Sequence, residues 1–352
     1  MRLTRLLPCV VVTVMYAGAM DAKAASSSSS LLRVENPSVV VKFDASTMSF
    51  SAFSKDSGVT FVERGTLATR EGQSRRIAFD HPTWGRGEAI ETTSSSGALD
   101  RLMLFPELPF VVFESTQTNR TDADVSLGSI QPVSLVLGAK REATSLHALG
   151  TAGLTGVGRD SNPGSYSFLA VADPESRAGF VAGWVTHERG SGLLFSDIEE
   201  GKAVVDARLD YGRLLVKPGR NVAPETLLIG YFADARLGLE AYADAVALHY
   251  RIKLPPQPTV YCTWYHAGAS NEKDLPASAA FAKECLAPFG FSVVQIDDGW
   301  QAGVTGNGPR KDFTTHRSDG PYASGMRRTA ENLRELGMTP GIWFMPFAGT
   351  WN

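Results

Sequence analysis

The stretch VVQIDDGWQ (residues 293–301) places two adjacent aspartates and a tryptophan directly after a short apolar run. Such a run is typical of a strand buried on both faces, as strands of parallel sheets are. Asp-Gly is also an ordinary turn signal, because aspartate makes local hydrogen bonds and glycine tolerates positive φ. Asp297 and Asp298 therefore either only end a strand or form part of a binding site at its carboxyl end.

Strands and helices are predicted to alternate around this stretch. The predicted strands are TVYCTWYH (259–266), FSVVQI (291–296) and GIWFMPF (341–347), and the predicted helices are residues 275–286, with Asp274 as N-cap, and residues 324–336, ending at Gly337. The order β-α-β-α-β favours a parallel sheet with helices on its faces. A dinucleotide-binding, doubly wound sheet would carry a glycine-rich turn after its first strand, and AGASNEKD does not match that turn. The first units of a TIM (β/α)₈ barrel are the better interpretation, and the chain stops after the third strand.

Each predicted strand ends in aromatic and polar residues. These groups are Trp264, Tyr265 and His266; Asp297, Asp298 and Trp300; and Trp343, Phe347 and Trp351. Binding residues of such barrels gather at the carboxyl ends of the strands. Aromatic rings pack on the apolar face of a sugar, and carboxylates accept hydrogen bonds from its hydroxyls. The pattern predicts a carbohydrate pocket, with core packing as the alternative role of the tryptophans.

The aspartate pair allows two other interpretations. A metal site with His266 or His316 would need several oxygen ligands at fixed spacing, and the sequence offers no such cluster. The acid and base of a glycosidase must flank the scissile bond, which adjacent residues on one strand cannot normally do. Asp297 and Asp298 are therefore better suited to hold two hydroxyls of one sugar.

The rest of the chain predicts a second, β-rich domain. With 352 residues and 43% apolar residues, two domains are expected. Residues 31–234 contain short β-branched and aromatic segments separated by turn residues, which predicts a large β-sandwich. Residues 235–258 follow as a helix and a proline-rich linker, and residues 259–352 form the partial barrel. The predicted inner face of the helix contains Leu237, Leu239, Tyr242, Ala243, Val246, Ala247 and Tyr250.

Residues 1–24 read as a signal peptide, followed by a serine-rich spacer over residues 25–30. The alternative is a membrane anchor, but the apolar stretch 6–20 is shorter than the ~20 residues of a spanning helix. We therefore expect a secreted or periplasmic protein without stable membrane insertion. The net charge of -3, without any run of Lys and Arg, argues against nucleic acid as a partner. Cys262 and Cys285 allow one disulfide at most, and their apolar neighbours favour two buried thiols.

The motifs TVYCTWYH, VQIDDGWQ and SGMRRTAENLRELGMTPGIWFMPFAG resemble the first barrel strands of glycoside hydrolase family 36, the α-galactosidase and raffinose synthase group. WGRGEAIE and AVADPESRAGFVAGWVTHERGSG resemble its sandwich domain. The related family 27 shares the aspartate pair but lacks the large N-terminal sandwich. The resemblance implies a retaining α-galactosidase acting on terminal galactosides of oligosaccharides, or a galactosyltransferase of the raffinose synthase type. A non-catalytic carbohydrate-binding protein is the third interpretation.

By this resemblance Asp297 and Asp298 bind hydroxyls of the terminal galactose, and Trp264, Trp300 and Trp343 surround it. The family often has G-D-W after strand two, where this chain has RKDF, so Asp312 is the aspartate carried over to that position. The family's nucleophile and acid/base follow strands four and six, so no catalytic residue is expected within this chain. We expect no cofactor, because two carboxyl groups suffice for the reaction. The exposed edge of the third strand predicts association of copies into a homo-oligomer.

Overall fold

The computed structural model describes residues 30–158, 164–265, 271–303 and 311–345. The chain divides into two compact units, Met1–Ile252 and Lys253–Asn352. The predicted signal peptide and, apart from Ser30, the serine-rich spacer lie outside the described residues. Among the residues that the structure describes, no helix has the length and apolar character needed to cross a bilayer.

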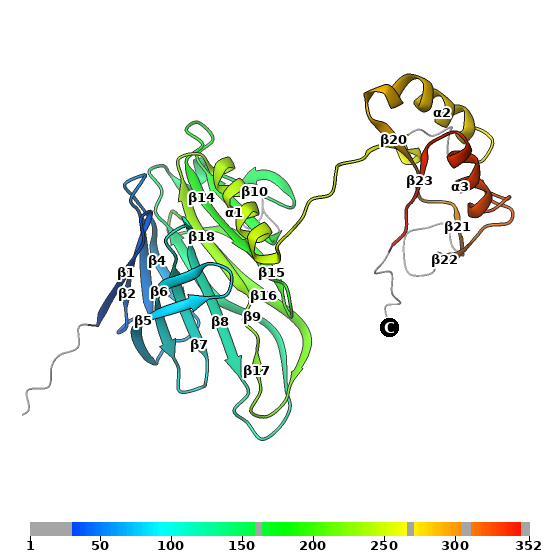
Figure 1. Ribbon diagram of the computed structural model, residues 1–352. Coiled ribbons are helices and arrows are strands. Elements are labelled where there is room, and N and C mark those ends of the chain that lie inside the picture. Colours follow the sequence, from blue (N-terminus) through cyan, green and yellow to red (C-terminus); the bar gives the residue numbers. More distant parts are fainter. Residues whose placement is uncertain (1–29, 159–163, 266–270, 304–310, 346–352) are drawn as a thin grey trace, which may run out of the picture. The chain divides into compact units, whose positions relative to one another are not determined.

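The first unit contains two large antiparallel sheets, which Figure 1 shows from blue to green. The eight-stranded sheet has the order β1 (Leu31–Glu35), β2 (Val39–Asp44), β3 (Ser49–Ser54), β4 (Val59–Leu67), β9 (Val125–Leu137), β16 (Lys202–Val216), β15 (Ser191–Glu199) and β12 (Ser165–Tyr166). The ten-stranded sheet has the order β11 (Gly153–Gly156), β10 (His147–Gly150), β13 (Phe168–Ala172), β14 (Gly179–Trp184), β18 (Thr226–Phe232), β8 (Val111–Thr118), β7 (Leu99–Leu104), β6 (Gly85–Thr93) and β5 (Gln73–His81), with β17 (Asn221–Val222) paired to β8. A short 3₁₀ helix, η1 (Ala143–Ser145), precedes β10.

The ten-stranded sheet is buried on both faces in its centre, which explains its nearly continuous apolar segments. On β8, Val111 and Phe113 belong to the core that both sheets share, whereas Val112 belongs to a second core on the opposite face. On β18, Leu227 and Leu228 divide in the same way. Side chains alternate between the two faces of a strand, so consecutive apolar residues serve two cores. The predicted β-rich segment thus forms sandwich-like sheets.

Helix α1 (Ala235–Tyr250) covers the second core, beside β14 and β18 (Figure 1). The helix was predicted, but its buried face is partly different, because Leu237 and Tyr250 are exposed. Small residues face the sheet instead, and Ala245 is buried there. They let the helix approach closely enough for the Tyr242 hydroxyl to donate to the Trp184 carbonyl at 2.6 Å.

The second unit contains a three-stranded parallel sheet in the order β19 (Thr259–Cys262), β20 (Phe291–Ile296) and β23 (Thr339–Ile342). Its other elements are the 3₁₀ helix η2 (Thr263–Tyr265), α2 (Leu275–Phe281), the π-helix η3 (Ala282–Leu286), the 3₁₀ helix η4 (Ala287–Phe289), the hairpin of β21 (Gln301–Gly303) and β22 (Lys311–His316), and α3 (Met326–Glu335). The predicted alternation of parallel strands and helices is confirmed. The first and third strands are shorter than predicted, and His266, Phe347 and Trp351 lie outside the described residues.

Two local predictions for this unit need correction. Asp274 is the N-cap residue of α2, as predicted, but its side chain makes no capping hydrogen bond. The Oδ1 of Asn271 instead accepts from the amides of Lys273 and Asp274, at 2.9 and 3.0 Å. Cys285 is exposed, and Cys262 is half-buried; both are free thiols. The wider π turn of η3 rotates Cys285 away from the buried Ala282.

A glycine on β15 provides a test of the sandwich core. A Cβ on Gly192 would lie 2.3 Å from Cγ of the buried Trp184 ring, so Gly192→Ala should lower the free energy of unfolding by about 1–3 kcal/mol. Gly128→Ala on β9 is the control, because its nearest neighbouring atom lies 3.9 Å away. Urea unfolding followed by circular dichroism should show a lower midpoint only for Gly192→Ala, and equal midpoints would contradict this packing.

Candidate functional site: a carboxylate pair at the strand ends

Parallel pairing brings the carboxyl ends of β19, β20 and β23 together. Cys262 pairs with Gln295, and Ile296 pairs with Ile342. Beyond the sheet, the amide of Asp297 donates to Thr263 Oγ1 at 3.0 Å, and the amide of Trp343 donates to the Ile296 carbonyl at 2.8 Å. Asp297 and Asp298 therefore leave the central strand between two neighbours that fix its end.

The Asp297 carboxylate is held by donors from two adjacent strands. Its Oδ2 accepts from Gln295 Nε2 at 2.9 Å and from Cys262 Sγ at 3.2 Å, and its Oδ1 accepts from the Asp298 amide at 2.8 Å. Burial raises the pKa of the Cys262 thiol, and the nearby Asp297 adds to this effect. Cys262 thus remains an S–H donor at neutral pH, and the carboxylate has a defined orientation.

The Asp298 carboxylate is held by a buried lysine. Asp298 Oδ1 accepts from Lys311 Nζ and from Gln301 Nε2, both at 2.5 Å. The Lys311 side chain is 0% exposed and that of Asp298 is 12% exposed. Burial alone would raise the pKa of Asp298, but the hydrogen bonds from Lys311 and Gln301 outweigh it and hold this pKa below 3.8. Asp298 is therefore ionised at neutral pH, and both close contacts engage the same oxygen.

Aromatic rings pack beside the pair. Trp300 is 5% exposed, and its Nε1 donates to the Trp343 carbonyl at 2.8 Å. Phe313 lies between the two tryptophans, with ring centroids at 6.0 Å from Trp300 and 5.8 Å from Trp343. Lys311 Nζ lies 5.7 Å from the centroid of the Trp343 ring. Trp300 is thus a core residue of this unit, whereas Trp343 is half-buried beside the ion pair.

Not all of the predicted site residues contact the aspartate pair. Trp264 lies in η2 with 60% exposure, and within the described ranges its side chain makes no hydrogen bond or ring contact with the aspartates. Asp312 accepts from the amide and hydroxyl of Thr314, which hold its pKa below the ordinary value. In the part of the chain that is described, no group of three or more His, Cys, Asp and Glu side chains could hold a metal ion.

Sequence reasoning missed the residues that orient the carboxylates. Lys311, Gln301 and Gln295 were not predicted as site residues. The alternation of a strand gave a signal for Lys311, because Lys311 and Phe313 are two positions apart on β22 and so share a face. That face is the one that meets Trp343.

Removal of the Lys311 ammonium tests the ion pair. Lys311→Met keeps most of the side-chain volume but leaves the largely buried Asp298 carboxylate without its cation. It should therefore lower the free energy of unfolding by about 3 kcal/mol at pH 7. In the native chain the folded pKa of Asp298 is lowered, so the pair's contribution is full above pH 3.8 and is lost as the pH falls through the folded pKa. Without Lys311, burial raises that pKa, and protonation relieves the penalty.

The difference in stability between the native chain and Lys311→Met should therefore be large at pH 7 and small at pH 3. Urea unfolding followed by tryptophan fluorescence measures it at both values. Lys273→Met, an exposed lysine of the same unit, is the control and should have little effect at either pH. A difference that is equally large at pH 3 would mean that Lys311 acts through packing alone.

Comparison with solved structures places the fold among glycoside hydrolases, although the sequence matches no protein-family model and no curated protein. A glycoside hydrolase family 36 α-galactosidase of Geobacillus stearothermophilus, the AgaA variant in complex with 1-deoxygalactonojirimycin, has a TM-score of 0.55 at 13% identity, covering 90% of this chain and 56% of that one. The α-galactosidase of Lactobacillus brevis has a TM-score of 0.53 at 12% identity, covering 90% and 55%.

A β-arabinopyranosidase has a TM-score of 0.57 at 12% identity, covering 91% of this chain and 56% of that one. The present chain therefore spans little more than half the length of these enzymes. Its sheets share the fold of the N-terminal part of glycoside hydrolase family 36 enzymes.

Proposed function

We propose that this chain is the N-terminal part of a retaining glycoside hydrolase that acts on terminal α-galactosides. The observation that carries the proposal is the pair Asp297 and Asp298, two carboxylates fixed by donors at the end of the central parallel strand. The fold likeness to family 36 α-galactosidases supports it. β19, β20 and β23, with their connecting helices, are then the first units of a (β/α)₈ barrel.

The pair suits a sugar-binding role. A hydroxyl that donates to an ionised carboxylate makes a stronger hydrogen bond than one that donates to a neutral acceptor. The Lys311 and Gln301 contacts occupy Oδ1 of Asp298, so a ligand hydroxyl would meet Oδ2. Because the protein already fixes both carboxylates, little side-chain entropy is lost when the sugar binds. Trp343 and the exposed Trp264 supply apolar surface at the same strand ends.

Cleavage needs two further carboxyl groups on opposite sides of the glycosidic bond, about 5–5.5 Å apart in a retaining enzyme. In the family these groups follow strands four and six, and the described parallel sheet contains three strands. Adjacent residues at the end of one strand cannot normally flank that bond, so we assign Asp297 and Asp298 a binding role, in which they position the sugar for carboxyl groups from other strands. The reaction needs no cofactor.

Galactosides are the proposed substrates because related folds are associated with this sugar. A Geobacillus α-galactosidase with a TM-score of 0.54 was solved in complex with raffinose. We also propose export through residues 1–24, so that the enzyme meets oligosaccharides outside the cytoplasm, and self-association through the edge of β23.

Isosteric substitutions test the sugar grip. Asp297→Asn and Asp298→Asn keep the shape but remove a charged acceptor, so each should weaken galactose binding about 10- to 100-fold. Saturation-transfer NMR with the 352-residue chain measures the affinity. Asp312→Asn is the control, because that side chain is already engaged by Thr314. Unchanged galactose binding in both variants, or equal binding of glucose, would contradict the proposed grip.

The 352-residue chain by itself should bind galactose without cleaving galactosides. The expected result of a 4-nitrophenyl α-galactoside assay is therefore no release of nitrophenol above the uncatalysed rate. Turnover that depends on Asp297 or Asp298 would show that this chain supplies its own nucleophile and acid.

A further inference from the structure

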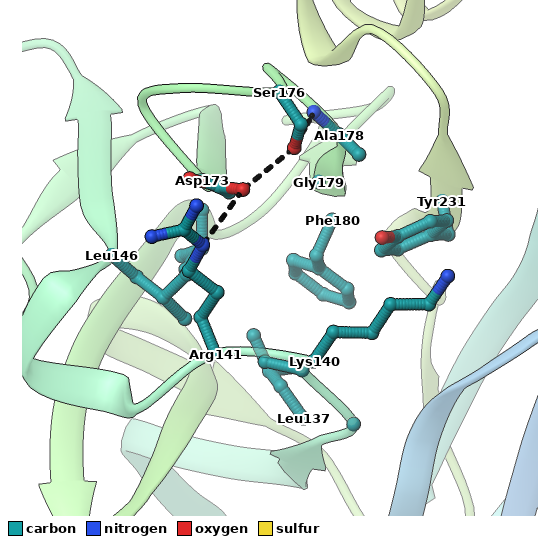
Figure 2. Close-up of a pocket in the computed structure, with 13 residues that line it drawn as sticks. Leu137, Lys140, Arg141, Leu146, Asp173, Ser176, Ala178, Gly179, Phe180 and Tyr231 are labelled. Atoms are coloured by element: carbon teal, nitrogen blue, oxygen red, sulfur yellow. Dashed lines mark hydrogen bonds and ion pairs between the residues drawn. The ribbon is translucent and has the colours of Figure 1, made fainter.

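A cavity of about 360 Å³ lies in the first unit, separate from the carboxylate pair. Figure 2 shows its lining, which comes from the end of β9, the loop that follows it, the turn between β13 and β14, and Tyr231 of β18. β9 belongs to the eight-stranded sheet and the other strands belong to the ten-stranded sheet. The cavity therefore opens where the two sheets of the first unit meet. Its volume lies at the lower end of the range of about 300–1,000 Å³ for small-molecule sites.

Part of the cavity lining is apolar and aromatic. Leu146, Val171 and Phe180 line it and also belong to the core between the sheets. Tyr231 packs against that core with its ring stacked on Phe61, the centroids 6.2 Å apart. These rings are fixed by packing, so they present a preformed apolar surface.

Another part of the lining is polar and equally fixed. Arg141 Nε lies 3.3 Å from Asp173 Oδ2, and Ser176 Oγ donates to the same oxygen at 2.7 Å. Arg141 also pairs with Glu175. The Asp173 amide donates to the Ala178 carbonyl at 3.0 Å, which closes the turn. The hydrogen bond from Ser176 is the main cause that lowers the pKa of Asp173, so the carboxylate is charged at neutral pH.

Two groups at the cavity are left for a ligand. Burial raises the pKa of Tyr231, as does the charge of Asp173, so its phenol keeps its proton. Among the described residues this hydroxyl makes no hydrogen bond. Figure 2 shows the Lys140 side chain extended past Phe180 with its ammonium toward Tyr231, and no acidic side chain of the described residues pairs with it.

The charges indicate the class of ligand. Lys140 and Arg141 contribute two positive charges, and Asp173 and Glu175 contribute two negative ones, so the site has no net charge. With two charges of each sign, the site gives neither an anion nor a cation a net electrostatic advantage. A neutral ligand with many hydroxyls can donate to Asp173, accept from Lys140 and place its C–H face on the aromatic rings of Phe180 and Tyr231.

We propose that this cavity is a second carbohydrate-binding site, which holds a ring of a neutral oligosaccharide between Tyr231 and the Arg141–Asp173 pair. Lys140 and the Tyr231 hydroxyl bind the sugar hydroxyls from the rim. The site lies wholly within the sandwich-like unit, and it binds its oligosaccharide without taking part in bond cleavage. Its assignment rests on the cavity and not on the proposed galactosidase function.

The test uses raffinose and the full 352-residue chain carrying Asp297→Asn and Asp298→Asn, so that binding at the strand ends is weakened. Saturation-transfer NMR should still detect raffinose binding in this background. Lys140→Met and Tyr231→Phe should each weaken that binding about tenfold, because each removes one hydrogen-bonding group. Lys217→Met, an exposed lysine outside the cavity, should leave it unchanged.

Galacturonate distinguishes a sugar site from an anion site. Equal or weaker binding of galacturonate than of galactose supports a neutral ligand, whereas binding of galacturonate alone would overturn the proposal. Absence of raffinose binding at millimolar concentrations, or affinities unaffected by both cavity variants, would also overturn it. Lys140 is exposed, so Lys140→Met should fold even if Tyr231→Phe disturbs the core. Failure of the galactose-grip variants in the other unit would not alter these outcomes.

Discussion

Parallel pairing of β20 with β19 on one side and β23 on the other is the constraint on which the site depends. It brings the carboxyl ends of three strands together, where Thr263 and Trp343 form hydrogen bonds with the backbone at the end of β20. Two adjacent carboxylates would repel each other in such a place without compensation. Hydrogen-bond donors compensate both carboxylates: Gln295 and Cys262 donate to Asp297, and Lys311 and Gln301 donate to Asp298.

Each of the two units contains an aspartate that is held in the same way. In each, an aspartate next to aromatic surface is fixed and kept ionised by a cation and a neutral donor: Lys311 and Gln301 for Asp298, and Arg141 and Ser176 for Asp173. A fixed, charged acceptor beside an apolar surface suits a ligand that is polar at its edge and apolar on its face, as a sugar ring is. Both proposed sugar sites have this combination. The aspartate pair lies at the carboxyl ends of the parallel strands, and the cavity lies where the two large sheets meet.

The sequence allowed much of this architecture to be predicted, because local patterns control it. The apolar run before Asp297, the β-branched segments of the sandwich and the helical period after residue 235 each reflect burial of nearby residues. What could not be predicted depends on contacts distant in sequence. A buried lysine is rare, and Lys311 becomes part of the site only because the β21–β22 hairpin brings it back to Asp298. Likewise, Trp300 was expected to face the sugar but is buried, and Leu237 was expected on the buried face of its helix but is exposed. Packing, and not hydrophobicity alone, decides which large side chain is covered.

A crystal structure of this chain with 1-deoxygalactonojirimycin tests directly whether the aspartate pair holds a sugar. We expect hydroxyls of the inhibitor to lie within hydrogen-bonding distance of both the Asp297 and Asp298 carboxylates, with Lys311 still bonded to Asp298 Oδ1. An inhibitor bound elsewhere, or one that leaves both carboxylates untouched, would contradict the role of the pair as a sugar grip.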